Sequence, residues 1–375
     1  MKVLIINLDK AIFEEGSTSR KRLVDYSGFL DKLFVIVFTC EKKEPMIYDN
    51  KLFIYPTNSR NRFFYYINSL RIAARILKYE KIDLIFTQDP FETGFAGYLL
   101  KKIYHVPLQI QIHTDFLSPF FSQESFLNKA RVLLAGFLLK RADCVRAVSK
   151  RIKNSLIASF KIPAEKIKVL PIFVDVKKIK ETQVKIDLKQ KYLEFNFITL
   201  IASRLSKEKN IALAISAMKD VVKNYSKAGL IIAGNGPEKN NLKSLIKKFN
   251  LEKNIIMESA VSFDTLVSYY KTADLFLLTS NYEGYGMVVA EAMAAGCPVL
   301  MTDVGLANEI LINKKDGMVV PPQNKEKLQD AILNLIQNPD IRKTFSKNSL
   351  TVVDFLPTKE EYLKSYYRML KNCVC

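Results

Sequence analysis

The sequence has few of the residues that bind metal ions or crosslink secreted domains. Its 375 residues include only two histidines and five cysteines. The cysteines are scattered and odd in number, namely Cys40, Cys144, Cys297, Cys373 and Cys375. This pattern favours a reducing compartment over a disulfide framework, so we expect these cysteines to have no chemical role. Cys373 and Cys375 could form a metal-binding pair, but an inert tail is the better interpretation of so short a motif.

Long apolar runs are also missing. The first run, Val3–Asn7, is far shorter than a secretory apolar region and is not followed by a cleavage pattern. No run approaches the roughly 20 apolar residues that a membrane-spanning helix requires. We therefore expect a cytoplasmic protein that does not cross the bilayer.

Acidic residues are outnumbered by basic ones, 38 to 57, which gives a net charge of +19. Such a charge attracts nucleic acid, anionic lipid or phosphorylated substrates, and the charge alone does not choose among them. No recognisable nucleic-acid-binding module is present, so we expect no nucleic-acid partner.

Short β-branched runs alternate with longer amphipathic segments along the whole chain, the pattern of an α/β protein with parallel sheets. In the first half we predict strands at Val3–Asn7, Leu33–Thr39, Ile82–Thr87, Leu108–His113, Cys144–Val148 and Lys166–Pro171. Between them we predict helices near Arg20–Leu30, Phe63–Lys78, Gly94–Lys102 and Phe126–Arg141.

A second alternating series predicts a second domain. Its strands are expected at Phe197–Ala202, Gly229–Ala233, Ile255–Met257, Leu275–Leu278, Val299–Thr302 and Met318–Val320. Its helices are expected at Ile211–Asn224, Lys239–Phe249, Asp264–Thr272, Gly286–Ala295 and Lys325–Asn338. We therefore expect one domain over 1–175 and another over 196–356, joined by a Lys-rich connection. A last helix after Pro357, within 358–375, is expected to cross back to the first domain.

The stretch 280–299 carries the strongest chemical signal. It follows an apolar strand, passes two glycines and enters a helix, which leaves backbone N–H groups and a helix dipole to bind an anion. The residues that we expect to supply this site are Gly284, Tyr285, Gly286 and Met287.

Two glutamates flank this helix start. Glu283 and Glu291 are eight residues apart, or roughly 12 Å along a helix axis. A carboxylate pair acting on one glycosidic bond needs about 5–9.5 Å, so the two side chains should contact different ends of one extended ligand. Glu291 would accept hydrogen bonds from a ribose, and Glu283 would lie nearer to a sugar.

A basic loop, 203–210, follows the predicted strand Phe197–Ala202. Arg204 and Lys209 in this loop could neutralise a diphosphate and the charge that builds on it as a sugar departs. The alternative is a solvated basic loop without a ligand.

Together these segments resemble glycosyltransferase family 4. The matching strings are Glu-Gly-Tyr-Gly, Glu-Ala-Met-Ala-Ala-Gly-Cys-Pro-Val with its Glu-x₇-Glu spacing, the loop beginning at Ser203, and the turn Gly234-Asn235-Gly236-Pro237. The resemblance implies a GT-B fold, in which two Rossmann-like, doubly wound domains face a central cleft. It implies a retaining transferase whose second domain binds a nucleotide-diphosphate sugar, with UDP or GDP, through Ser203, Arg204, Lys209, Gly234, Asn235 and the segment 283–291.

Two segments depart from the family pattern. Near 258–261, where the family contacts the base, this chain has Glu-Ser-Ala-Val, so the base is left open. The loop after the first strand has only Gly16 where the family often has a glycine pair that approaches the phosphate. Gly16 remains a candidate donor contact.

His113 is expected at the carboxyl end of a strand in the first domain. A lone histidine is commonly a satisfied structural residue. The family places a histidine here to hydrogen-bond the donor sugar or the acceptor, and we predict the same role for His113.

We expect no metal or other cofactor. Asp-x-Asp, typical of the metal-dependent sugar transferases, does not occur. No carboxylate nucleophile is evident, which favours attack on the face from which the diphosphate departs. Two alternatives remain open: a GT-B-fold nucleotide-sugar epimerase, which needs no acceptor, and a non-catalytic protein that binds a membrane surface.

The positive charge suggests a membrane-bound acceptor. Basic residues cluster in the first domain, with Arg146 among them, and Arg71, Arg75 and Lys78 line one helical face near aromatic stretches at 63–66 and 116–121. Such surfaces suit peripheral contact with anionic lipid and a lipid-linked or cell-envelope glycan acceptor. The alternative is that the aromatic residues are core and the charges merely solvated.

Overall fold

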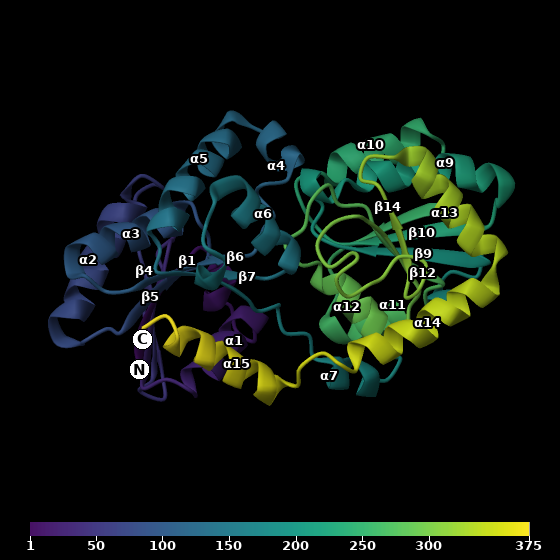
Figure 1. Ribbon diagram of the computed structural model, residues 1–375. Helices are drawn as coiled ribbons and strands as arrows, with labels where there is room; N and C mark the ends of the chain where they lie inside the picture. The colour runs from purple at the N-terminus through teal and green to yellow at the C-terminus, as the bar shows by residue number, and fades with distance from the viewer. Residues whose placement is uncertain (375) are drawn as a thin grey trace. The chain divides into compact units, whose positions relative to one another are not determined.

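The computed structural model describes residues 1–374, which form two compact units (Figure 1). The first unit comprises Met1–Pro171 and the C-terminal segment from Lys359 onward, and the second comprises Ile172–Thr358. Each unit has its own sheet and its own core.

The first unit is built on an eight-stranded sheet in the order β3-β4-β2-β1-β5-β6-β7-β8. All neighbouring strands are parallel except β3 and β4. The strands are β1 Lys2–Asn7, β2 Lys32–Val37, β3 Met46–Tyr48, β4 Leu52–Pro56, β5 Leu84–Thr87, β6 Leu108–Ile112, β7 Cys144–Ala147 and β8 Ile167–Val169. Most of these strands are buried along their length, as expected for a sheet covered by helices on both faces.

Helices cover this sheet. They are α1 Thr18–Ser27, α2 Phe64–Tyr79, α3 Glu92–Tyr104, α4 Pro119–Gln123, α5 Phe126–Arg141, α6 Lys150–Phe160 and α15 Lys359–Lys371, with 3₁₀ turns η1 Lys10–Phe13 and η2 Ala164–Lys166. In Figure 1, α2, α3 and α5 lie over one face of the sheet, and α1 and α15 over the other.

The second unit has a six-stranded parallel sheet in the order β11-β10-β9-β12-β13-β14. Its strands are β9 Phe197–Ala202, β10 Ala228–Ala233, β11 Ile255–Glu258, β12 Leu275–Leu278, β13 Val299–Thr302 and β14 Met318–Val320. Numbered from β9, this order is 3-2-1-4-5-6, that of a doubly wound nucleotide-binding sheet. The order reverses between β9 and β12, so the loops after these two strands diverge at a switch point where such sheets bind ligands.

The helices of the second unit are α7 Val176–Glu181, α8 Leu188–Lys191, α9 Ile211–Asn224, α10 Lys239–Lys248, α11 Phe263–Thr272, α12 Met287–Ala294, α13 Lys325–Gln337 and α14 Pro339–Val353, with the 3₁₀ turn η3 Lys207–Lys209. Helix α9 shows why they form. Its apolar residues recur at helical spacing, and Ala214, Ile215, Met218 and Val221 are buried against the sheet. Fully burying each of the larger side chains stabilises the unit by roughly 1.5–3 kcal/mol.

The expected α/β architecture is confirmed, and several elements match the predicted bounds residue for residue, among them β9, β12 and α5. The short strands β3 and β4 and helix α6 were not predicted. The edge strand β3 is only three residues long and partly exposed, so it lacks the continuous apolar run that marks the central strands.

The segment 172–196, which we expected to be an interdomain connection, belongs to the second unit. Two of its backbone N–H groups are tied to α11: Lys185 N donates to Ser268 Oγ at 3.0 Å, and Leu188 N to Thr272 Oγ1 at 3.1 Å. Its two helices are four and six residues long and bury one side chain each, which explains why the sequence shows little periodicity there.

The C-terminal helix α15 is anchored to the first unit by a buried arginine. Arg146, on β7, donates to the carbonyl oxygens of Leu170 and Pro171, to Gln111 Oε1 at 3.0 Å and to Tyr362 Oη at 3.0 Å. We had grouped Arg146 with the basic residues available to a membrane. That assignment is wrong, because the side chain is buried and fully engaged in holding α15.

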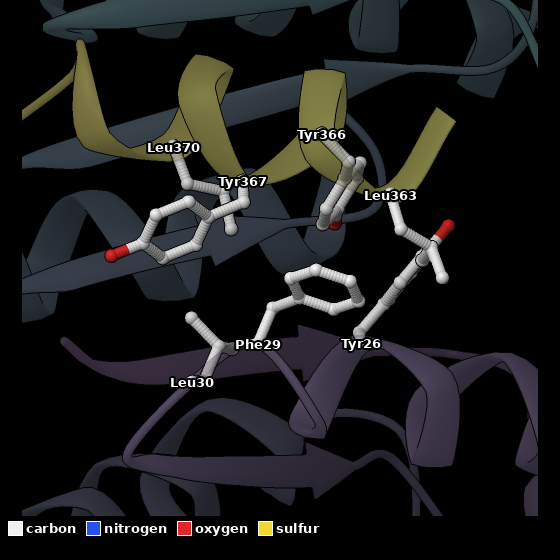
Figure 2. A pocket seen from close by; sticks show the side chains of 7 residues that line it. All are labelled: Tyr26, Phe29, Leu30, Leu363, Tyr366, Tyr367 and Leu370. Atoms are coloured by element: carbon white, nitrogen blue, oxygen red, sulfur yellow. The ribbon is translucent and has the colours of Figure 1, made fainter. Parts of the chain in front are cut away.

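A small aromatic cavity between α1 and α15 belongs to the same anchor (Figure 2). The rings of Tyr26 and Tyr366 stack at its wall with their centroids 4.1 Å apart. Phe29 and Leu30, which follow α1, and Leu370 of α15 add apolar lining. The cavity is therefore a feature of helix packing, away from the carboxyl edges of the strands.

The expectation that the cysteines have no chemical role is wrong for two of them. Cys144, at the start of β7, forms a disulfide with Cys373, just after α15, with their Cα atoms 5.9 Å apart. The pairing depends on the return of α15 to the first unit, which brings together residues separated by 229 positions. Cys40 is free and exposed, Cys297 is free and buried, and Cys375 lies outside the described residues.

Candidate functional site

The candidate site of the second unit is centred on the loops that follow β9 and β12, at the switch point of the sheet. Hydrogen bonds join these two loops. Thr279 Oγ1 donates to the carbonyl oxygen of Lys209 at 3.0 Å, and Asn281 N donates to that of Glu208 at 2.8 Å. The two segments singled out from the sequence therefore form one structure.

Lys209 and Glu283 form an ion pair at this junction. Lys209 Nζ lies 2.6 Å from Glu283 Oε1, and both side chains are largely buried. Ser280 Oγ also donates to Glu283 Oε1, at 2.7 Å. Glu283 thus holds the lysine ammonium in a fixed position at the carboxyl end of the sheet, where a phosphate could replace or share its contacts.

Arg204 lies on the same loop but is not part of this pair. Its side chain is 70% exposed and its guanidinium lies 2.7 Å from Glu208 Oε1. Burial by itself would raise the pKa of Glu208, but hydrogen bonds from Ser206 and Arg204 outweigh it and hold the pKa below its usual value. Glu208 is therefore a charged partner that keeps Arg204 at the surface of the loop.

The turn after β10 packs directly against the basic loop. Gly234 has a φ of +156°, and a Cβ there would lie 1.9 Å from the carbonyl oxygen of Ser203. A Cβ at Gly236 would lie 2.3 Å from the carbonyl oxygen of Leu205, whose N–H donates to Asn235 O at 2.9 Å. The two glycines are therefore required for the close approach of two backbones, and Asn235 holds them in register.

Ser203 contributes a second unusual feature. Its Oγ is buried and has no hydrogen-bond partner among the described residues. Buried hydroxyl groups are nearly always satisfied, so an unsatisfied one at the end of β9 fits a place where a ligand binds.

The segment Gly284–Met287 leads into α12 as expected. Gly286 caps the helix with a φ of +89°, and no side chain caps the helix N-terminus. Gly305 approaches the same segment, since its Cβ would lie 2.4 Å from the carbonyl oxygen of Tyr285. An uncapped helix N-terminus and its dipole favour an anion, which is the property that the predicted anion site requires.

Glu291 lies inside α12 and is buried. It accepts a hydrogen bond of 3.2 Å from Tyr270 Oη on α11. Burial raises the pKa of Glu291, and the bond from Tyr270 opposes this rise. The carboxylate has capacity for further hydrogen bonds, as a contact with ribose hydroxyls would require.

In the first unit, His113 follows β6 at the carboxyl edge of the sheet. Its Nε2 atom is buried and has no partner in the described part of the chain. Burial, together with the positive charges of Arg146 and Arg22, lowers the pKa of His113 to about 3. The imidazole is therefore neutral at physiological pH and has one unsatisfied ring nitrogen to offer to a ligand.

Gly16 has no comparable role in packing. It is exposed, its φ is +72°, and a Cβ there would meet nothing within 4 Å. The structure thus requires the left-handed backbone of Gly16 for the turn before α1, and not a close backbone approach.

Two charged groups near the strand ends were not predicted. Asp89, after β5, accepts from Thr93 Oγ1 at 2.6 Å and from the N–H of Phe91 at 2.7 Å, and burial raises its pKa to about 6. Asp89-Pro90 directly after a strand was the available signal. Glu258, at the end of β11, accepts hydrogen bonds from Lys191, Tyr192 and Tyr269. These partners come from two other segments of the chain, so no pattern along the sequence indicated this cluster.

Among residues 1–374, no cluster of three or more histidine, cysteine, aspartate or glutamate side chains is placed to bind a metal ion. Over the same residues, no helix combines the length and apolarity needed to span a bilayer.

Two family models match the chain. Residues 185–351 match the model for glycosyl transferases group 1, and residues 29–178 match the model for glycosyltransferase family 4. The two models therefore match different units, each over most of its length.

Curated glycosyltransferases are similar to this chain over much of its length. An uncharacterised glycosyltransferase of Methanocaldococcus jannaschii is 29% identical over 73% of this chain and 71% of its own length. The alpha-monoglucosyldiacylglycerol synthase of Streptococcus pneumoniae is 28% identical over 72% of this chain and 63% of its own length.

Solved structures match nearly the whole chain. Sucrose-phosphate synthase of Thermosynechococcus elongatus has a TM-score of 0.84 at 18% identity, covering 99% of this chain and 98% of that one. Anabaena HepE in complex with UDP has a TM-score of 0.76 at 20% identity, and the match covers 99% of this chain and 100% of that one.

Proposed function

Because the chain belongs to glycosyltransferase family 4 and has the GT-B fold, we propose that it is a retaining enzyme that uses a UDP- or GDP-sugar as donor. The observation that carries this proposal is the Lys209–Glu283 ion pair beside the open N-terminus of α12. A fixed cation and a helix dipole at a switch point suit a diphosphate.

In this proposal the second unit stabilises the leaving group. The bond between the sugar's anomeric carbon and the diphosphate oxygen breaks, and the electron pair remains on the diphosphate. Lys209, the N–H groups at the start of α12 and the exposed guanidinium of Arg204 would stabilise that charge. Glu291 would bind the ribose, and Glu283 would hold Lys209 in place while lying nearer to the sugar.

The configuration at the anomeric carbon is retained if the acceptor hydroxyl attacks this carbon from the same face of the sugar that the diphosphate leaves. Its oxygen bonds to the anomeric carbon, and its proton passes to the departing phosphate oxygen. This route suits a site whose two carboxylates are already engaged, Glu283 by Lys209 and Ser280, and Glu291 by Tyr270. Neutral His113 would hydrogen-bond a hydroxyl of the sugar or of the acceptor.

We propose a lipid-linked or cell-envelope glycan acceptor, met at the inner face of a membrane through peripheral contact of the first unit. Two relatives support this choice by their names, the diacylglycerol-modifying synthase of Streptococcus pneumoniae and a Campylobacter jejuni transferase whose acceptor is a diphospho-undecaprenol glycan. The excess of basic residues is consistent with an anionic membrane.

The test is to incubate the protein with a panel of UDP- and GDP-sugars, with and without a polyprenyl-diphosphate-linked sugar, and to analyse both the nucleotide and the sugar. Nucleotide release that depends on the acceptor, with an α-linked product from an α-linked donor, supports the proposal. A changed sugar without acceptor would indicate an epimerase, and neither reaction would indicate a binding protein. We expect the rate to be unchanged by a chelator, because protein cations supply the charge stabilisation.

A further inference from the structure

Helix α5 is apolar on its exposed side as well as on its buried side. Its inner face packs through Ala135, Leu138 and Leu139. Its outward residues include Phe126, which is 87% exposed, and Leu133, which is 78% exposed. These two residues are seven apart and so lie on one helical face. A surface helix normally has polar residues there, so the outer side of α5 is built for contact with something apolar.

Helix α2 extends this surface. Phe63, just before it, and Phe64 and Ile67 in its first turns are exposed, while the rest of its outer face is basic, with Arg71 and Arg75. In the stretch 116–121, which we had expected to contribute aromatic residues, Phe116 and Phe121 are buried and Phe120 is partly exposed.

The two helices belong to one layer. Helix α3 lies between them and contacts both (Figure 1). Its ring contacts show this arrangement, since Phe95 lies against Tyr66 of α2 and Tyr98 against Phe137 of α5. We call the outward side of α2, α3 and α5 the outer helical face.

The charge of this layer has one sign. Helices α2, α3 and α5 contain nine lysines and arginines and one acidic residue, Glu92, which is already paired with Arg131. The cations also accompany the apolar side chains. The Arg141 guanidinium lies 3.7 Å from the centroid of the Phe137 ring, and Lys129 Nζ lies 5.2 Å from that of Phe126.

We propose that the outer helical face rests on an anionic lipid bilayer. Exposed aromatic and aliphatic side chains would enter the boundary between headgroups and acyl chains, while the neighbouring lysines and arginines stay at the phosphate level. Nucleic acid would complement the positive charge, but it would not cover the exposed apolar side chains of Phe126 and Leu133 on α5. A second copy of this chain would not pair through the same face, because two positively charged faces repel each other. The inference rests on the proposed membrane-borne acceptor, to which it adds the surface and the lipid class.

The experiment is sedimentation of the full-length protein with vesicles of phosphatidylglycerol and phosphatidylcholine, or of phosphatidylcholine alone, without sugar donor. We expect binding at least tenfold tighter to the anionic vesicles. The variant Phe126→Glu with Leu133→Glu should lose at least tenfold in binding. The matched control is Phe355→Glu with Leu193→Glu, two residues of the second unit that are 85% and 81% exposed, and it should bind as the wild type does.

A second pair of variants tests the charge. Changing Lys129 and Lys140 to Gln should weaken binding by roughly fivefold for each lysine and reduce its dependence on salt. The control changes Lys177 and Lys343, whose side chains are 84% and 80% exposed in the second unit. Thermal unfolding of each variant verifies that it is folded.

Three results would overturn the inference. The first is that the wild-type protein binds neither kind of vesicle. The second is that the Phe126→Glu and Leu133→Glu variant binds as tightly as the control variant. The third is that the wild type self-associates, that this variant is monomeric, and that neither binds vesicles. Donor turnover is measured separately with a water-soluble acceptor analogue. Turnover without vesicle binding would contradict only the membrane surface, whereas the absence of turnover would contradict the proposed transferase activity.

Discussion

Lys209 Nζ lies 2.6 Å from Glu283 Oε1, although 74 residues separate the two in the sequence. The ion pair joins the loop after β9 to the loop after β12, the two strands between which the order of the second sheet reverses. The pair therefore holds the Lys209 ammonium group in a fixed position, where the Glu283 carboxylate neutralises its charge. This position is where a doubly wound sheet binds its ligand.

Replacing Lys209 with Ala should lower kcat by about 10²–10³-fold, the cost typical of losing one group that stabilises charge in a transition state. The measurement is the initial rate of nucleotide release, with circular dichroism to verify folding. Lys207→Ala, an exposed lysine of the same loop, is the control and should leave the rate unchanged. Wild-type turnover in the Lys209 variant would contradict the site.

Glu291→Gln should weaken donor binding and also stabilise the protein at neutral pH. Burial raises the pKa of Glu291, so the charged form costs stability in the folded state above the unfolded pKa. The neutral Glu291 carboxyl therefore stabilises the folded protein at low pH. This stabilisation is lost as the pH rises through the pKa of Glu291 in the folded state.

The amide has no such loss, so the melting temperature of the Glu291→Gln variant should exceed that of the wild type at pH 7, and the difference should vanish near pH 4. The donor KM should rise about tenfold or more, since a hydrogen bond to a charged group contributes about 1.5–3 kcal/mol. Glu326→Gln, on the exposed side of α13, should change neither quantity.

His113 should make the first unit less stable as the pH falls. Its pKa is about 3 in the folded state, whereas an unfolded histidine titrates near 6.5. Below pH 6.5 the histidine is protonated in the unfolded chain but stays neutral in the folded chain. This group therefore lowers the free energy of unfolding by roughly 2 kcal/mol between pH 7 and pH 5.

Urea unfolding of wild type and His113→Asn at the two pH values measures this effect by difference, and the variant should show a pH dependence smaller by about that amount. Asp89, whose pKa is raised by burial to about 6, acts in the opposite direction but is present in both proteins and cancels. His105→Asn is the control, because His105 is exposed and its positive φ is one that asparagine tolerates. An unchanged pH dependence in the His113 variant would refute the assignment.

Arg146→Met should destabilise the first unit by about 3 kcal/mol or more, because it leaves two carbonyl groups and the polar groups of Gln111 and Tyr362 without their donor. Tyr362→Phe should cost about 1 kcal/mol. Thermal unfolding and limited proteolysis near 354–358 are the measurements, since release of α15 should increase cleavage of this already exposed segment. The exposed Arg141, changed to Met, should have little effect.

Cys144 and Cys373 should be linked after purification without reductant, so that mass spectrometry recovers their peptides as one crosslinked species. Cys144→Ser should lower stability by about 2–4 kcal/mol without reductant and by much less with it. Cys40→Ser, which removes an exposed free thiol, serves as the control. Equal effects of Cys144→Ser in both conditions would mean that the pair is not bonded in solution.

The alternation of apolar runs and amphipathic segments was enough to locate the central strands and most helices, because a fully buried parallel strand requires a continuous apolar run. It was not enough for β3, which is short and lies at the edge of its sheet. The same limit applies to α7 and α8, which bury one side chain each. Elements with few buried residues leave little periodic signal.

The candidate site was predictable to the extent that it lies on contiguous segments. The strings around Arg204, Gly234 and Glu283 each marked a loop after a strand. Their partners were not visible. Nothing in the sequence indicated that Glu283 pairs with Lys209, that Glu208 holds Arg204 away from that pair, or that Tyr270 donates to Glu291.

The sequence by itself determined the repeating strand and helix order, the glycine-rich entry to α12 and the positions of the basic and acidic site residues, because each of these depends on neighbours along the chain. Only the tertiary structure decided which charges meet, that Arg146 is a buried anchor, that Cys144 reaches Cys373, and that Phe126 on α5 is exposed whereas Phe116 and Phe121 are buried. The physical reason is that burial and pairing depend on which distant segments pack together, and a side chain's neighbours along the chain do not specify that.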